Sequence, residues 1–157
     1  MKKQKITELL ISIAIAELVG VLSGLLAGNS AEFYSGLVKP PLSPPGWLFP
    51  VVWPILYALM GISAYLIYAS DADGQKKKKA LTLYGAQLFV NFMWSIVFFR
   101  FQWIGASVVI IILLLVLVIW MTAVFYKIRP SATWINFPYI LWLLFAAYLN
   151  IGVFVLN

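Results

Sequence analysis

Long apolar stretches alternate with short polar segments along the whole chain. Five of these stretches are long enough to cross the hydrocarbon of a bilayer, which takes about 20 apolar residues in an α-helix. They lie at about residues 6–27, 47–69, 80–99, 104–126 and 133–156. The pattern predicts an all-α membrane protein, one domain built as a bundle of five transmembrane helices.

The connections between these stretches differ in length and composition. Residues 28–46 form the one long connection, and their four prolines disfavour regular helix. We expect this segment to be the lid of a pocket at one end of the bundle. The other links, at residues 71–79, around Arg100 and at 127–131, are short and favour antiparallel neighbours in a compact bundle.

Composition supports the membrane assignment. Of 157 residues, 64% are hydrophobic and only 10% are charged, whereas soluble domains have about 45–50% and about 25%. This leaves too little polar surface to cover a water-soluble globule. A cleaved signal peptide is the alternative for the first stretch, which follows Met1 and a lysine-rich segment, but its apolar run exceeds the usual length of about 7–15 residues.

The basic residues divide unevenly between the two ends of such a bundle. The end that carries the N-terminus takes Lys2, Lys3, Lys5, Lys76, Lys77, Lys78, Lys79, Lys127 and Arg129. The other end keeps only Lys39 and Arg100. For an energised cytoplasmic membrane, the positive-inside rule therefore predicts a cytoplasmic N-terminus and an external proline-rich loop, and a location in an outer membrane would void this prediction. The lysine run also fits a solvated interfacial anchor without a specific partner.

Cysteine and histidine are both absent from the sequence. Their absence removes thiolate chemistry, the usual zinc and haem ligands, and the commonest general base near neutral pH. We expect no metal site, no covalently held cofactor and no nucleic-acid partner. Any chemistry must come from aromatic rings, amides or carboxylates.

Polar and aromatic residues recur at helical spacing in three of the stretches. The third stretch aligns Tyr84, Gln87, Asn91, Trp94 and Phe98. The fifth aligns Tyr139, Trp142, Ala146 and Asn150. The second aligns Trp53, Tyr57 and Gly61 near Pro50 and Pro54, whose rings each remove a backbone donor and favour a kink.

Two interpretations of these stripes remain open. If the stripes converge, they line a cavity with aromatic walls and a few amides, the usual composition of a small-molecule pocket. Alternatively, the amides only join helices and the tryptophans form a belt at the membrane interface.

The first stretch carries Glu17 near its middle, where an ionised carboxylate is costly and indicates a functional site unless it is protonated. On the same helix Ala16, Gly20, Gly24 and Gly28 form a small-residue ridge. The ridge permits close helix packing, either within one chain or between two copies.

Four segments together resemble the TspO/MBR family, which includes the bacterial tryptophan-rich sensory proteins and the mitochondrial translocator (peripheral benzodiazepine receptor) protein. They are residues 39–47 (KPPLSPPGW), 53–61 (WPILYALMG), 87–94 (QLFVNFMW) and 138–142 (PYILW). Their order and spacing match the family over nearly the whole chain. The resemblance implies a five-helix bundle, commonly a homodimer, that binds porphyrins in the bundle.

Combining the stripes with the resemblance gives a candidate ligand-binding set. It consists of Trp47, Trp53, Tyr57, Gln87, Asn91, Trp94, Phe98, Tyr139, Trp142, Ala146 and Asn150. A metal-free porphyrin suits aromatic walls without an axial ligand. Lys39 and Arg100 are candidates for its propionates at the mouth, although both also fit ordinary side chains that reach the interface. Sterol binding is unsupported, because the sequence ends without the Tyr-containing motif of the animal proteins.

Three functions follow from the resemblance. The first is a membrane sensor or receptor that binds porphyrin or another hydrophobic ligand. The second is an enzyme that degrades protoporphyrin in light, with Trp53 and Trp142 as the required residues. The third is a transporter, although five helices show no clear internal repeat.

Overall fold

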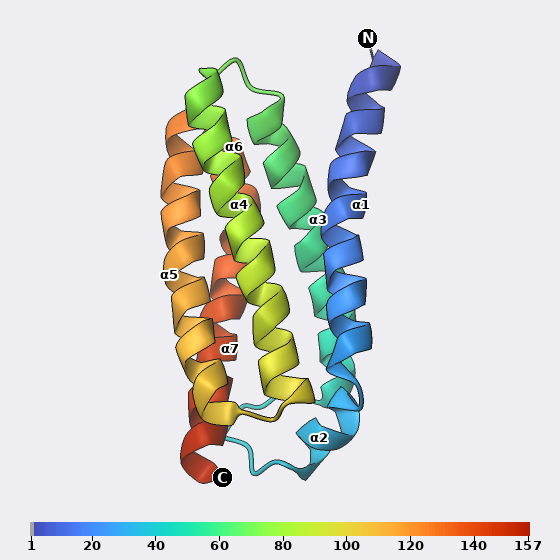
Figure 1. Cartoon of the computed structure of the whole chain (residues 1–157), viewed down its shortest axis with the longest axis vertical. Helices are drawn as coiled ribbons and strands as arrows, with labels where there is room; N and C mark the ends of the chain where they lie inside the picture. The colour runs from blue at the N-terminus through green and yellow to red at the C-terminus, as the bar shows by residue number, and fades with distance from the viewer. Residues whose placement is uncertain (1) are drawn as a thin grey trace.

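The computed structural model describes residues 2–157, and it is a bundle of helices in five antiparallel spans (Figure 1). The spans are α1 (Lys2–Ala27), α3 (Phe49–Tyr68), α4 (Gly74–Ser95), α5 (Ile104–Ile128) and the pair α6 (Pro130–Ile135) and α7 (Phe137–Leu156). Within the described residues there is no strand. The predicted all-α bundle is confirmed.

Each span is long and apolar enough to cross a membrane. Many large apolar side chains on the outer faces are exposed, among them Ile15 and Leu25 of α1 and Val109 and Val116 of α5. Such faces are stable against lipid and not against water. The chain is therefore an integral membrane protein.

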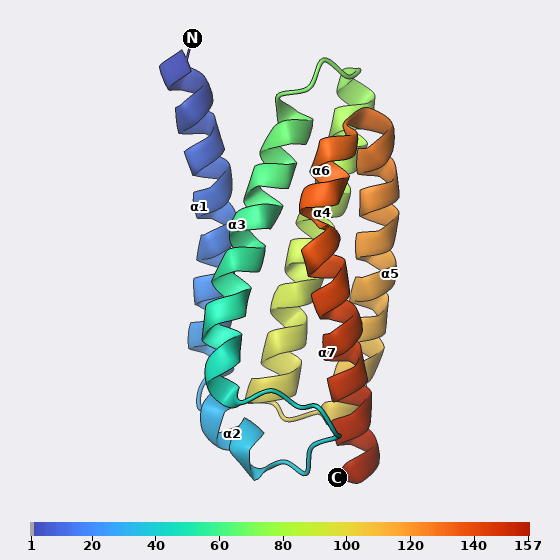
Figure 2. The same ribbon diagram turned by 180° about the vertical axis from the view of Figure 1, so that it is seen from behind.

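Helix α1 lies at one edge of the bundle, where it packs along α3 (Figures 1 and 2). Helix α4 packs on α5, and α5 packs on α7. The two termini lie at opposite ends, because the number of spans is odd (Figure 1). The long connection after α1 lies at the end that carries the C-terminus, across the ends of α3 and α7 (Figure 2).

The long connection is more ordered than its prolines suggested. A short helix, α2 (Ser30–Gly36), follows α1, and a 3-10 turn, η1 (Gly46–Leu48), precedes α3. The expectation of no regular helix in residues 28–46 was therefore wrong at its start. All four prolines lie after Gly36, so nothing in the earlier part opposes a helical turn.

Helix α4 begins at Gly74 instead of near residue 80, so the lysine run belongs to its first turns and not to the preceding turn. The signal for this start is Asp73, whose carboxylate accepts hydrogen bonds from the backbone N–H groups of Gln75 and Lys76 at 3.1 and 3.4 Å. The helix ends in a π-helical turn, η2 (Ile96–Arg100).

The fifth span is two helices and not one, because it breaks at Asn136. This side chain is fully buried, and its Nδ2 donates to the Ser63 hydroxyl of α3 at 2.6 Å. The Ser63 hydroxyl in turn donates to the Ala132 carbonyl at 2.7 Å. The break is thus fixed to α3 by hydrogen bonds, which explains why an otherwise apolar region contains an asparagine.

Candidate ligand-binding cavity

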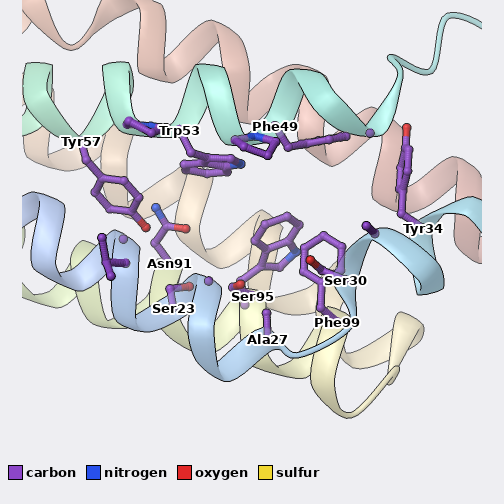
Figure 3. A pocket seen from close by; sticks show the side chains of 18 of the residues that line it. Ser23, Ala27, Ser30, Tyr34, Phe49, Trp53, Tyr57, Asn91, Ser95 and Phe99 are labelled. Carbon is purple, nitrogen blue, oxygen red and sulfur yellow. The ribbon is translucent and has the colours of Figure 1, made fainter.

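A cavity of about 360 Å³ lies between α1, α3 and α4, with α2 at one end (Figure 3). Helix α3 contributes Phe49, Trp53 and Tyr57, and Figure 3 shows these side chains along one side of the space. Ser23 and Ala27 of α1 lie on the opposite side. This volume is within the range of small-molecule pockets, about 300–1,000 Å³.

Small residues of α1 create the space. Gly20 lies so close to Tyr57 that an added Cβ would come within 2.6 Å of the phenol ring. A Cβ on Gly24, one turn further along, would meet nothing within 4 Å, and both glycines line the cavity. The small-residue ridge therefore serves packing within the chain at Gly20 and leaves open volume at Gly24.

Aromatic rings form the wall opposite α1. The ring centroid of Trp53 lies 5.8 Å from that of Tyr57 and 6.3 Å from that of Trp94 on α4. Phe98 is stacked on Trp94 at 5.7 Å and is buried behind it, outside the cavity lining. Flat faces of this kind favour an aromatic ligand that stacks against them.

The polar stripes of α4 and α7 face each other more than they face the cavity. The Tyr139 hydroxyl donates to Gln87 Oε1 at 2.8 Å and accepts from Asn91 Nδ2 at 3.1 Å. Of these three residues only Asn91 lines the cavity. Tyr139 and Gln87 are fully buried and hold the Asn91 amide in place from behind.

A second polar cluster fixes Trp94. Its indole Nε1 donates to Asn150 Oδ1 at 2.8 Å, and Asn150 Nδ2 donates to the Ser107 hydroxyl at 2.9 Å. These contacts join α4, α7 and α5. Asn150 therefore supports an aromatic wall residue and does not itself line the cavity.

The remaining residues of the candidate set lie outside the cavity lining. Trp142 packs edge-on to Trp53, with ring centroids 6.5 Å apart, and Ala146 is buried on the same helix. Trp47 is 67% exposed in the turn before α3. The structure thus places Trp53, Tyr57, Asn91 and Trp94 around the cavity and the others behind or beyond it.

The two basic candidates at the loop end have other neighbours. Lys39 Nζ donates to the carbonyls of Tyr34, Ser35 and Leu37 at 2.9, 3.4 and 3.1 Å, and so caps the end of α2. Arg100 is exposed beside Gly28, where an added Cβ would lie 3.2 Å from its Nη1. Neither side chain lines the cavity.

The loop over this end of the bundle is held at both of its sides. Tyr34 of α2, which lines the cavity, donates its hydroxyl to the Pro44 carbonyl at 2.7 Å. Burial raises the pKa of the Tyr34 phenol, so it stays a neutral donor. Near the C-terminus, Asn157 exchanges hydrogen bonds with the backbone of Val38 at 3.0 and 2.8 Å. The loop is thus positioned to cover the cavity.

Several lining residues were absent from the sequence-based set, namely Ser23, Ser30, Tyr34, Phe49, Ser95 and Phe99. Ser23 had a usable signal, because it is a small residue three positions after Gly20 and so lies beside the small-residue ridge of the first span. Tyr34 and Ser30 had none, since they belong to a segment expected to be irregular.

A family model described as the TspO/MBR family matches residues 12–156. The tryptophan-rich protein TspO of Chlorobaculum tepidum is 33% identical over 100% of this chain and 99% of its own length. The protein of the same name from Archaeoglobus fulgidus is 35% identical over 97% and 98%. The human translocator protein is 33% identical over 82% of this chain and 76% of its own. With the five-span bundle and the tryptophan-rich segments, these matches establish that the chain belongs to the TspO/MBR family.

Proposed function

We propose that this protein is a membrane sensor or receptor that binds a porphyrin, or a hydrophobic aromatic ligand of similar shape, in the cavity between α1, α3 and α4. The observation that carries the proposal is the aromatic wall of Trp53, Tyr57 and Trp94 facing a cavity in the membrane-spanning part. Membership of a family that includes sensory and translocator proteins supports it.

Replacing Trp53 with leucine tests this function. We expect affinity for protoporphyrin to fall about ten-fold, because one stacking face is lost. The matched control is Trp47→Leu, since Trp47 is 67% exposed and outside the lining. Ligand titrations in lipid nanodiscs measure both. Equal affinities of the wild type and both variants, or no binding by the wild type, would contradict the proposal.

The acid groups of such a ligand would lie at the loop end, where the Arg100 side chain is exposed. Lys39 could join only by giving up its carbonyl partners on α2. For this reason we propose Arg100 as the first propionate partner and Lys39 as the second.

The charge distribution supports a cytoplasmic N-terminus and an external loop in the bacterial cytoplasmic membrane. Because the chain has no cysteine, single cysteines report on topology without background. In intact cells, a membrane-impermeant maleimide is expected to label Ser35→Cys in α2 and to spare Gln75→Cys at the start of α4. Both should react after lysis. The reverse labelling would overturn this orientation.

A further inference from the structure

The cavity contains one carboxyl group, that of Glu17. Glu17 is half-buried on α1 and belongs to the cavity lining. It precedes the end of α1 at Ala27 by about 15 Å along the helix axis, and so lies in the central part of the span. Within residues 2–157 its carboxyl accepts no hydrogen bond, and no lysine or arginine lines the cavity.

The Glu17 carboxyl, which lacks a hydrogen-bond partner among the described residues, determines which ligands the cavity can bind. A ligand carboxylate placed near an ionised Glu17 would meet a like charge, and no lysine or arginine in the described part of the chain lines the cavity to neutralise either group, which is unfavourable away from water. A nitrogen that carries a proton would instead supply the missing donor. Hydrogen bonds to charged groups are among the strongest in proteins.

The aromatic wall also favours a ligand that carries positive charge. The faces of Trp53, Tyr57 and Trp94 are electron-rich and attract cations as well as flat rings. These rings lie on α3 and α4, whereas Glu17 lies on α1, so a ligand between the helices can contact both. The carboxyl and the rings are independent features, and both favour an aromatic nitrogen compound.

We propose that Glu17 is the specificity-determining residue of this cavity. Its carboxyl accepts a hydrogen bond from a protonated or N–H-bearing nitrogen of an aromatic ligand and keeps acid groups of the ligand at the loop end. This inference rests on the proposed function only in requiring that the cavity binds ligands.

Two ligands with the same ring system but opposite charge test the proposal. They are 9-aminoacridine, which is a cation at neutral pH, and acridine-9-carboxylate, which is an anion. Their affinities are measured by fluorescence titration in nanodiscs of zwitterionic phosphatidylcholine, with empty nanodiscs as the reference for lipid partitioning. The wild type is expected to bind the cation at least about ten-fold more tightly than the anion.

Replacing the carboxyl should reduce this preference. Glu17→Gln keeps the shape of the side chain and is expected to bind the cation less than about three-fold more tightly than the anion, which is the part of the preference that the aromatic wall contributes. Glu8→Gln is the matched control, because Glu8 lies on the same helix but outside the cavity lining. It should retain the wild-type preference. Glu17→Asp keeps the charge, retains part of the preference, and serves as the test variant if Glu17→Gln does not fold.

The outcomes separate this inference from the proposed function. Equal binding of both acridines by the wild type, or an undiminished preference in Glu17→Gln, would overturn the role of Glu17. Protoporphyrin is titrated in parallel. If the wild type ignores protoporphyrin but discriminates between the acridines through Glu17, the porphyrin proposal fails and the role of Glu17 stands. If protoporphyrin binds and the acridines are not distinguished, the opposite holds.

Discussion

The substitution Gly61→Ala is expected to destabilise the bundle by about 1–3 kcal/mol, the usual cost of adding a methyl group where no space exists. A Cβ at Gly61 of α3 would lie 2.6 Å from Ile13 Cα and 2.9 Å from the Ser12 carbonyl oxygen of α1. These are backbone atoms, so only movement of the whole helix relieves the clash. That movement would also break the bond from the Ser12 hydroxyl to the Gly61 carbonyl, now 2.7 Å.

Thermal unfolding in detergent measures this loss, and Gly85→Ala is the control. A Cβ at Gly85 of α4 would meet nothing within 4 Å. Alanine there should stabilise the helix by about 0.5–1 kcal/mol, because glycine loses more backbone entropy on folding. The two substitutions are chemically identical and are expected to shift the melting temperature in opposite directions. Shifts of the same sign and size would show that α1 and α3 do not approach this closely.

Gly61→Ala should also weaken ligand binding, since α1 forms one side of the cavity. Displacing α1 from α3 separates Glu17 and Gly20 from Tyr57 and Trp53. A variant that loses stability but keeps full affinity would place the ligand away from the space between α1 and α3.

The second large effect is expected from Tyr139→Phe, which removes a single oxygen atom. Its hydroxyl is the shared partner of Gln87 Oε1 and Asn91 Nδ2, and all three residues are buried. Phenylalanine would leave two amide groups without this partner. We expect a loss of about 2 kcal/mol, since each unsatisfied polar group costs about 1–3 kcal/mol and less where a membrane-spanning helix finds other partners.

Tyr84→Phe provides the control for this prediction. The Tyr84 hydroxyl is also buried, but it has no hydrogen-bond partner. Removing it should leave stability unchanged or raise it slightly, because no bond is lost and a desolvated polar atom disappears. Equal losses for Tyr139→Phe and Tyr84→Phe would contradict the hydrogen-bond network. Tyr139→Phe should also weaken ligand binding, since Asn91 loses the partner that orients it in the cavity.

Much of the architecture could be predicted from the sequence. The five spans follow from the length of their apolar runs, because lipid offers no hydrogen-bond partners to the backbone and a helix satisfies its N–H and C=O groups internally. Helical periodicity placed Gln87, Asn91 and Trp94 on one face, and all three are buried. Whether the polar stripes of the third and fifth spans converge was left open by the sequence, and the hydrogen bonds of Tyr139 with Gln87 and Asn91 show that they do.

The position of the cavity depended on the tertiary structure. Helical periodicity identifies the polar and aromatic face of a helix but not the neighbouring helix that this face contacts. The amides of α4 are satisfied largely by α7, so the space opens on the other side, where Gly24 of α1 leaves room. For the same reason the sequence could not separate Tyr57, which lines the cavity, from Tyr139, which is packed behind it.

Local contacts determined where the side chains of the connection between α1 and α3 lie. The Lys39 ammonium group donates hydrogen bonds to the carbonyls at the end of α2. This helix was not predicted from the sequence, because prolines follow it. Trp47 lies in the same tryptophan-rich pattern as Trp53 yet is exposed, because the turn before α3 directs it outward. The sequence by itself determined the spans and their polar faces, through hydrophobicity and period. Only the packing of five helices decided which of those faces enclose space, since a cavity is a property of several segments together.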